Sequence, residues 1–378
     1  MKRRFKLKIN GESPRSLFLA FVLAKLKCDV YLYDFLGDNN SKKNNQIFLF
    51  SNFSKNLLIN FDIWKEFEDI SFGFNSLKFK DNLVSEQCLI RTENFSEEYL
   101  KNIGWTARYS KIKCLLIDKL NRLKNVHFIP ENQLIDESII FDFEFNFKSS
   151  EEYPLSIFKG LDEQIIIFNV YLRGNVEKRM YEINTTEGLL ILTPINKNLY
   201  QIIWNNSSSQ IKERSVTSRG LFLDNLSTLL PYEFKVDEII GDIKFLYYRK
   251  FSSIYSIKNN SIYFNENKFI SNTLYDFNFD IIIKNILLIY NFLENDKPKN
   301  IKIYNKFGFY YLYRKYVELK IIFSFSNTSI NLFILNDMVS LFIRKLLFTL
   351  FKRINLFKVF FIGILINSNI KDEFKNIK

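Results

Sequence analysis

The sequence predicts a mixed α/β protein in which a parallel sheet, an antiparallel sheet and a helical C-terminal region follow one another. Three observations support this prediction. Between Phe5 and Asp34, an alternating run, a Gly/Pro turn, an apolar segment of about four helical turns and a second strand form a βαβ pattern. Short β runs separated by Gly, Asn and Thr lie between residues 165 and 204. From Ile301 onward the segments are helical in spacing and rich in aromatic residues.

The βαβ unit is followed by further helices and strands in alternation. Its own helix is expected over residues 17–27, where Lys25 and Lys27 suit the C-terminal end of the helix dipole. Apolar spacing predicts helices at 54–67 and 110–123, with Ser54 and Ser110 as their N-caps. The strands expected in this half are residues 30–33, a pair within 70–92, residues 125–129 and the alternating run 138–147.

In the second half of the chain, the sequence predicts an antiparallel sheet and helices. Its strands are expected at residues 165–171, 179–183, 189–194 and 200–204, and a later short strand at 261–264. Residues 215–230 and 281–294 are apolar at helical spacing, so we expect a helix at each.

Composition and charge narrow the class of protein. With 378 residues, 47% of them hydrophobic, the chain is expected to fold into two or three domains with a large core. Its 41 Phe and only 11 Gly indicate drift toward AT-rich codons, which can replace functional glycines by accident. The net charge of +12 allows a nucleic-acid or membrane partner, but the basic residues are dispersed. We therefore expect a solvated basic surface and no nucleic acid.

Histidine and cysteine usage disfavours several kinds of active site. The one histidine, His127, leaves no multi-His metal site or Ser-His-Asp triad unless it takes part itself, and we expect it to be an ordinary strand residue. Cys28, Cys88 and Cys114 are odd in number and widely spaced, which indicates a reducing compartment and gives no zinc pattern. Since Phe5 to Ile9 alternates like a strand, we expect no signal peptide and a cytoplasmic location.

The turn from Gly11 to Ser16 is the first candidate site. It lies where a dinucleotide-binding protein has G-x-G-x-x-G, with Ser13 and Ser16 in place of the second and third glycines. Asp34 ends the following strand, where an acidic residue would bind the ribose hydroxyls. Gly11, Ser13, Ser16 and Asp34 are therefore candidate cofactor-binding residues. The alternative is a plain strand-to-helix turn and an exposed strand end.

Several segments carry a resemblance to a known family. The middle of the chain gives the most specific likeness, and two earlier segments add to it. The chain resembles the FAD-dependent aromatic hydroxylases of ubiquinone biosynthesis, which have the p-hydroxybenzoate hydroxylase-like fold. The segments that carry the likeness are Phe50 to Leu58 with Phe61 to Trp64, Ile103 to Trp105, Tyr181 to Ile183, Thr186 to Ile195 and Tyr200 to Trp204.

The three flavin signatures of that family are altered in this chain. The first is the turn at Gly11. The second, an Asp-Gly pair in the family, is Glu144-Phe145 here. The third, a Gly-Asp pair, is replaced by Asn265-Glu266, so Glu266 becomes a candidate cofactor ligand, and the loop Lys268 to Asn278 contains no glycine. Arg108 stands where the family usually has Glu.

The resemblance implies a Rossmann-like FAD/NAD(P)-binding fold and a domain division. The FAD-binding domain would comprise residues 1–70, 96–150 and 240–298, and an antiparallel-sheet substrate domain would comprise 71–95 and 151–239. Residues 299–378 would form a C-terminal helical region.

The implied activity is that of a flavin-dependent monooxygenase. It would hydroxylate an aromatic or polyprenylated quinone precursor, with NAD(P)H as reductant, and could belong to a quinone-biosynthesis complex. Because a flavin carries the oxygen chemistry, no catalytic residue can be named from the sequence. The alternative is a cofactor-free relative that keeps the fold and acts as a binding or scaffold protein.

The C-terminal stretch 329–366 suggests peripheral membrane contact. Charges interrupt its apolar runs, so no uncharged stretch reaches the ~20 residues that a membrane span requires. Amphipathic helices with basic edges are expected instead, either on the inner face of a membrane or packed on the fold. A substrate with a polyprenyl tail would make membrane contact physically sensible.

Overall fold

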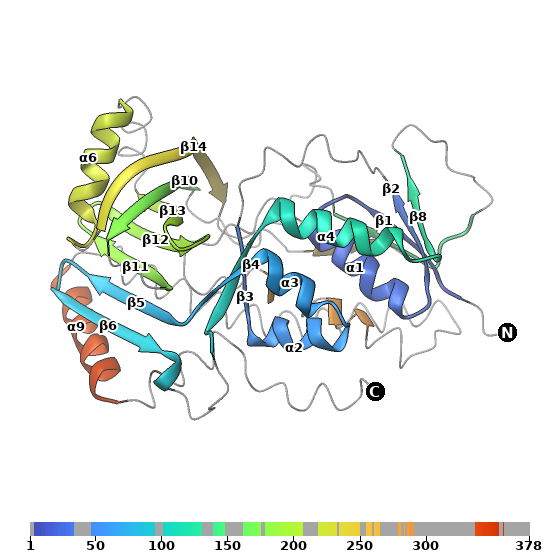
Figure 1. Ribbon diagram of the computed structural model, residues 1–378, viewed down its shortest axis with the longest axis horizontal. Coiled ribbons are helices and arrows are strands. Elements are labelled where there is room, and N and C mark those ends of the chain that lie inside the picture. Colours follow the sequence, from blue (N-terminus) through green and yellow to red (C-terminus); the bar gives the residue numbers. More distant parts are fainter. Residues whose placement is uncertain are drawn as a thin grey trace.

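The computed structural model describes the following residues, and every structural statement below concerns them: 4–33, 47–94, 101–130, 139–147, 162–174, 178–206, 218–232, 234–249, 255–258, 261–264, 279–280, 283, 286–287, 289–290, 337–354 and 358. Two larger sheets and one small sheet are arranged along the molecule (Figure 1). The fold class predicted from the sequence, mixed α/β with parallel and antiparallel sheets, is confirmed.

The N-terminal βαβ unit forms the centre of a mainly parallel sheet. Lys6 pairs with Asp29 and Asn10 with Tyr33, so the first two strands are adjacent and parallel, as the sequence predicts. The strand order is β15 (Tyr255–Lys258), β16 (Ser261–Phe264), β9 (Phe143–Asn146), β1 (Lys6–Asn10), β2 (Asp29–Tyr33) and β8 (Val126–Ile129), with β15 antiparallel to β16.

Two helices cover one face of this sheet. Helix α1 (Pro14–Lys25) is buried along most of its length, and α4 (Tyr109–Asn121) packs beside it (Figure 1). Leu7, Ile9 and Phe18 are completely buried in the shared core. Burial of such side chains stabilises the fold by about 1.5–3 kcal/mol each. Helix α4 begins one residue before Ser110, with Arg108 as N-cap, so the predicted Ser110 cap is wrong.

A small antiparallel sheet and two short helices follow in place of one predicted helix. The sheet order is β3 (Ile47–Ser51), β7 (Gly104–Arg108) and β4 (Ser71–Phe74). The helix expected over 54–67 is divided into α2 (Asn52–Asn60) and α3 (Trp64–Ile70), because Asp62 takes a left-handed φ of 55°. Ser51, not Ser54, caps α2 through its side chain.

The second large sheet is mostly antiparallel. One pairing is parallel. Strand β11 (Arg179–Thr185) runs beside β5 (Ser76–Asp81), with Arg179 paired to Ser76, although about a hundred residues separate the two strands in the chain. Helix α6 (Arg219–Leu229) packs on one face through Phe222 and Leu226. The order is β14 (Phe234–Arg249), β10 (Asp162–Gly174), β13 (Leu199–Asn206), β12 (Gly188–Pro194), β11 (Arg179–Thr185), β5 (Ser76–Asp81) and β6 (Glu86–Arg91), and a 3-10 turn (Thr92–Asn94) follows.

Helix α9 (Met338–Arg353) lies against the β5–β6 end of that sheet (Figure 1). Its Phe348 is buried with Leu77 and Ile90 in a hydrophobic cluster. None of the described helices is long and apolar enough to cross a membrane.

Candidate functional site

The turn between β1 and α1 lies at the carboxyl edge of the parallel sheet, where ligands bind in open α/β folds. Gly11 has a φ of 120°, a conformation that L residues rarely adopt. Its N–H donates to the Tyr33 carbonyl over 3.3 Å, which ties the turn to the end of the neighbouring strand. The strand–turn–helix geometry of a dinucleotide site is therefore present.

The two serines of this turn point inward and bond to the turn itself. Ser13 is the N-cap of α1, and its Oγ accepts from the Ser16 N–H over 3.2 Å. The Ser16 Oγ lies 2.8 Å from the Ser13 carbonyl and 3.0 Å from the Gly11 carbonyl, to either of which it can donate. Both side chains are buried. The Ser13 hydroxyl thus occupies one N–H that a glycine turn would leave for a ligand, while the Ser16 hydroxyl bonds to carbonyls, which do not bind phosphate.

Gly11 is also required for packing. A Cβ added at Gly11 would lie 3.0 Å from the Phe147 Cβ, which is tighter than ordinary side-chain contact. Phe147 follows β9 and its N–H donates to the Asn10 carbonyl over 2.9 Å. The space that the missing side chain frees is therefore taken by a neighbouring strand end.

Glu12, in the middle of the turn, forms an ion pair with Lys113 of α4. The Lys113 Nζ lies 3.1 Å from the Glu12 Oε1, and the side chains are 2% and 20% exposed. An unpaired Glu12 would repel a phosphate at this turn. Lys113 compensates that charge, which removes the main electrostatic objection to a pyrophosphate here.

The described residues fit the pyrophosphate of a dinucleotide at this turn. The backbone has the required shape, the serine side chains do not project outward, and the charge of Glu12 is compensated. Gly11, Ser13 and Ser16 are thus brought together as predicted. Asp34 and Glu266, the other two predicted cofactor ligands, lie outside the described residues.

Glu144, which replaces the Asp of the second signature, is held within the sheet. It lies 3.7 Å from the Lys8 Nζ and accepts from the Ser261 Oγ over 3.2 Å. These contacts join β1, β9 and β16 and account for the carboxylate without a ligand.

Asp280 is a buried carboxylate that the sequence analysis did not single out. It accepts from the Ser51 N–H over 3.0 Å and from the Ser54 Oγ, and it is 4% exposed. It therefore anchors the start of α2 to the helical residues 279–280. Because the partners are more than 220 positions apart in the chain, no local signal could reveal this contact.

A polar strip crosses the second large sheet on the face opposite α6. Asn169, Gln201 and Thr193 are cross-strand neighbours on β10, β13 and β12. The Gln201 amide donates to the Asn169 Oδ1 over 3.3 Å, and Thr193 is only 6% exposed. The strip ends beside the small sheet, because the Thr106 Oγ donates to the Pro194 carbonyl over 2.5 Å. It can offer hydrogen bonds to a polar substituent of a ligand.

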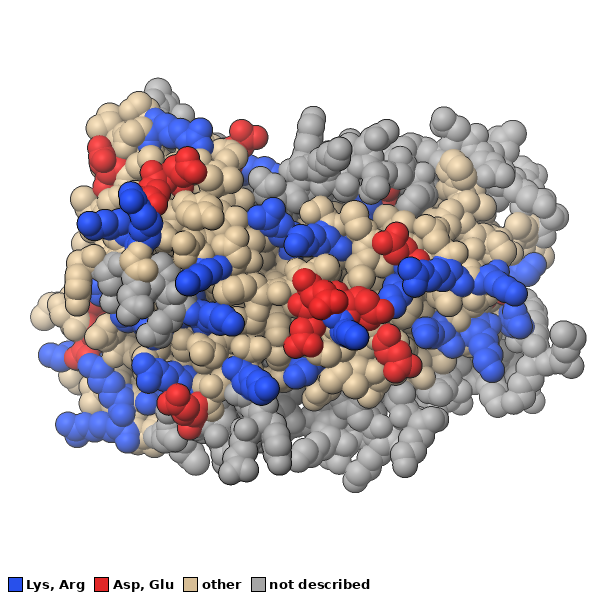
Figure 2. Space-filling model, in the orientation of Figure 1, with Lys and Arg blue, Asp and Glu red and all other residues tan. Residues whose placement is uncertain are grey.

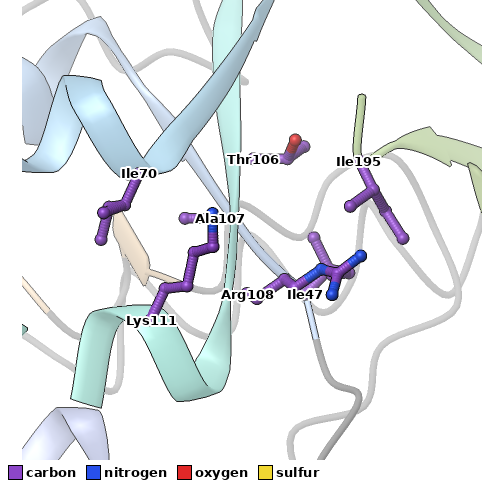
Figure 3. Close-up of a pocket in the computed structure, with 7 residues that line it drawn as sticks. All are labelled: Ile47, Ile70, Thr106, Ala107, Arg108, Lys111 and Ile195. Carbon is purple, nitrogen blue, oxygen red and sulfur yellow. The ribbon is translucent and has the colours of Figure 1, made fainter. Parts of the chain in front are cut away.

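A small pocket opens where the small sheet meets the end of β12 (Figure 3). It has about 240 Å³ of space, part of it open to solvent. Arg108 and Lys111 line it and both are exposed. The other described residues that line it are Ile47, Ile70, Thr106, Ala107 and Ile195.

The cysteines do not form a redox or metal centre among the described residues. Cys28 and Cys88 are buried and Cys114 is exposed, and none is in a disulfide. Burial raises the pKa of the Cys28 thiol to about 12, so it stays protonated at neutral pH. The part of the chain that is described holds no cluster of His, Cys, Asp and Glu suited to a metal ion.

The C-terminal helix uses Arg344, one of the basic residues of the stretch 329–366, inside the fold. Arg344 is fully buried and lies 3.4 Å from Asp81, which is also fully buried. Burial lowers the pKa of Arg344, and Asp81 opposes that effect. Lys352 pairs with Glu86 of β6. Arg344 therefore cannot contact lipid, because it fixes α9 to the sheet.

On the face drawn in Figure 2, basic side chains are scattered and acidic ones lie between them. This matches the dispersed pattern read from the sequence.

Comparisons with known proteins define the fold and not the activity. No protein-family model matches the chain, and no curated protein matches it by sequence. Among solved structures, p-nitrophenol 4-monooxygenase from Pseudomonas putida DLL-E4 is similar with a TM-score of 0.73 and 10% identity, covering 97% of this chain and 99% of that one.

Two more solved structures agree. A probable FAD-dependent monooxygenase, pqsL from Pseudomonas aeruginosa, gives a TM-score of 0.63 at 12% identity, over 87% of this chain and 97% of that one. 2-Methyl-3-hydroxypyridine-5-carboxylic acid oxygenase is similar with a TM-score of 0.61 and 11% identity. The match covers 86% of this chain and 90% of that one. The chain has the fold of these three oxygenases, and neither the family models nor the curated proteins link it to the ubiquinone branch.

Proposed function

We propose that this chain is a flavin-dependent monooxygenase that hydroxylates an aromatic ring. Its fold is shared with a p-nitrophenol monooxygenase over 97% of the chain and with a probable FAD-dependent monooxygenase over 87%. Two of the similar structures are named for aromatic compounds, p-nitrophenol and 2-methyl-3-hydroxypyridine-5-carboxylic acid. The observation that carries the proposal is the turn at Gly11, which has the φ and the position of a pyrophosphate-binding turn in this fold.

In this proposal the residues of the chain bind and orient, and the cofactor supplies the oxygen chemistry. FAD, when bound and reduced, provides the activated oxygen that a ring carbon receives. The turn Gly11 to Ser16 and the start of α1 hold the pyrophosphate. The polar strip around Thr193 and Gln201 fixes a polar substituent of the ring, and the apolar sheet around it excludes water.

We propose more specifically that the substrate is a quinone precursor and that NAD(P)H is the reductant. The enzyme would act in the cytoplasm as part of a quinone-biosynthesis complex. Support comes from the likeness of residues 181–204 to the hydroxylases of ubiquinone biosynthesis. The test is turnover of polyprenylated phenols with NADH or NADPH, followed by mass spectrometry. A product 16 Da heavier is expected, and uncoupled reductant oxidation alone would argue against these substrates.

Titration with FAD tests the general proposal. We expect saturable quenching of flavin fluorescence, with weak affinity because the Ser13 Oγ already accepts from the Ser16 N–H, which could otherwise donate to a phosphate. If the protein shows no saturable binding at millimolar FAD, the monooxygenase proposal fails.

A second candidate, a cofactor-free relative that binds partners, is favoured by one observation. The turn is satisfied internally, with the Ser13 Oγ on the Ser16 N–H and Phe147 against Gly11. In that case the same titration shows no binding, while the unfolding temperature is unaffected by added FAD.

We also propose a peripheral contact of α9 with an anionic membrane. Its outer face exposes Met338, Phe342 and Leu346, between 49% and 83%, and Lys345 lies among them. Apolar side chains beside a cation suit insertion into an anionic lipid surface. Phe342→Asp should reduce sedimentation with anionic vesicles and Arg353→Gln less so. Equal sedimentation of Phe342→Asp and unchanged protein would exclude this role of α9.

A further inference from the structure

We propose that Arg219 guards the outer edge of strand β14 and that, without this guard, the edge pairs with the same edge of a second copy of the chain. Strand β14 is the last strand of the second large sheet, and β10 is the only described strand that pairs with it. Sixteen residues of backbone therefore border the sheet on this side (Figure 1). An open strand edge is a ready template for another strand. The inference concerns association and does not depend on flavin.

The first support is the direction in which the backbone groups of β14 point. The Leu172 N–H donates over 2.9 Å to the Asn198 carbonyl, just before β13, so the even-numbered residues of β10 bond toward β13 and the odd-numbered ones toward β14. Asn169 is odd-numbered and lies opposite Ile240, so Ile240 bonds toward β10. The neighbouring carbonyl of Ile239 therefore points away from the sheet.

Arg219, at the start of α6, occupies this outward side. Its Nη2 atom donates to the Ile239 carbonyl and, over 3.2 Å, to the Gly241 carbonyl two residues further along β14. A further strand would lie about 4.8 Å from β14 and would need the same carbonyls as acceptors. The guanidinium therefore takes the place and the hydrogen bonds of the next strand. A charged side chain at an edge is one of the features that keep natural sheets from pairing with one another.

The second support is an irregularity of β14 at the same point. Lys244 and Ile240 pair with residues of β10 that are only two positions apart, so residues 241–243 lie opposite Phe168 alone. Gly241, the first of the three, has a φ of 78°. Such a bulge bends and twists an edge strand, which also disfavours pairing with a straight partner. Two protective features thus coincide in the middle of this edge.

The third support identifies the partner that the guard excludes. A strand edge pairs antiparallel with its own copy when a two-fold axis crosses it. With Gly241 opposite its own copy, Glu238 of each copy lies opposite Lys244 of the other, so two pairs of opposite charges meet. β-Branched and aromatic residues around this point also favour strand pairing, namely Ile239, Ile240, Ile243 and Phe245. A second copy thus complements this edge in direction and in charge.

Arg219→Ala tests the inference through the mass of the particle in solution. Analytical ultracentrifugation over a range of concentrations should show a species of twice the mass of the unchanged protein. Its self-association should be at least about tenfold tighter, since the freed carbonyls accept from a second strand. Arg219→Lys keeps a cation and a donor, so its mass should stay that of the unchanged protein. An Arg219→Ala protein that keeps the unchanged mass at every concentration would refute the guard.

Arg173→Ala is the matched control. The Arg173 side chain is 72% exposed on the neighbouring strand and pairs with Asp237 of β14, so this variant removes the same charge without freeing an outward carbonyl. Its mass should be that of the unchanged protein. In Arg219→Ala, hydrogen exchange of the amides of residues 235–245 should slow as the concentration rises, whereas destabilisation alone would speed it. Equal association of both variants, or association without this slowing, would overturn the proposal.

Charge reversal tests the register of the pairing. Adding Glu238→Lys to Arg219→Ala places like charges opposite each other and should restore the mass of the unchanged protein. Adding Lys244→Glu as well restores opposite charges, so association should return. If Glu238→Lys has no effect on association, the proposed pairing with a second copy is wrong. Should Arg219→Ala lose its folding transition in circular dichroism, Arg219→Met, which keeps most of the length of the side chain, replaces it in every comparison.

Discussion

Helices α1 and α4 pack side by side, and they begin in opposite ways. At the start of α1, the Ser13 Oγ accepts from the Ser16 N–H and both serines are buried. At the start of α4, no side chain caps the helix, and Arg108 and Lys111 are exposed in a pocket. The two starts lie close enough for Glu12 of one to pair with Lys113 of the other.

The difference leads us to expect that the backbone conformation of a helix start does not by itself set its affinity for an anion. The α1 start has the conformation of a nucleotide site but makes many of its own hydrogen bonds, so we expect its flavin affinity to be low. The α4 start has no glycine signature and yet combines a helix dipole with two cations. A glycine pattern therefore indicates where a chain can bind phosphate, and side-chain capping affects how tightly.

Gly11→Ala should have the largest effect on stability. It adds a Cβ 3.0 Å from the Phe147 Cβ at a φ of 120°, so strain and overpacking together should lower the free energy of unfolding by about 2–4 kcal/mol. Urea denaturation measures the change. The structure directs the added side chain at Phe147, the residue that follows β9.

Gly220→Ala is the matched control for this substitution. Gly220 lies in the first turn of α6, and an added Cβ meets nothing within 4 Å. We expect stabilisation of up to about 0.5–1 kcal/mol, since Ala is the better helix former. If Gly11→Ala is as mild as this control, the close packing of the α1 turn is not a constraint.

Periodicity was sufficient to predict most of the fold. The βαβ unit and the four runs between 165 and 204 have the strand and helix spacing that the structure contains. β14 was missed because its sixteen residues mix charged and aromatic side chains without a regular alternation. Its pairing with β10 also shifts register at two places. β3 and β7 were missed because their pairing joins segments more than 50 residues apart and is decided by tertiary contact.

The candidate site was predictable in position but not in chemistry. The sequence located the turn from Gly11 to Ser16 through the βαβ pattern, with Gly11 in the place of the first glycine of a dinucleotide turn. It could not show that Ser13 caps its own helix, or that Lys113, a hundred residues away, neutralises Glu12. Arg108 was noted only as a departure from a family pattern, because a pocket depends on which strands meet.

Lys113→Met should have the second largest effect. It keeps the length of the side chain but removes the partner of Glu12, which is mostly buried. The free energy of unfolding should fall by about 1–3 kcal/mol, less than for a fully buried pair because Glu12 is 20% exposed. FAD binding should weaken as well, since the Glu12 carboxylate then remains at the turn without the positive charge of Lys113.

Lys119→Met is the control, because it breaks a second ion pair of the same helix. Lys119 and Glu66 are 21% and 39% exposed. We therefore expect the free energy of unfolding to fall by less than about 1 kcal/mol and the FAD affinity to stay the same. Adding Glu12→Gln to Lys113→Met should restore part of the stability and the flavin affinity. Should the double variant be as unstable as Lys113→Met and bind FAD as weakly, the loss of stability and of FAD affinity comes from packing and not from charge.

Ser13→Gly has the smallest expected effect on stability and tests the comparison of the two helix starts most directly. Replacing a serine N-cap by glycine costs only a few tenths of a kcal/mol. It frees the Ser16 N–H, to which a pyrophosphate oxygen can then bond, so FAD affinity should increase by about tenfold. Ser218→Gly is the control, because Ser218 caps α6 without a side-chain hydrogen bond. Fluorescence titration of both variants measures the effect. Unchanged FAD affinity in Ser13→Gly would mean that internal capping does not limit binding at α1, and the contrast with α4 would then lie in charge alone.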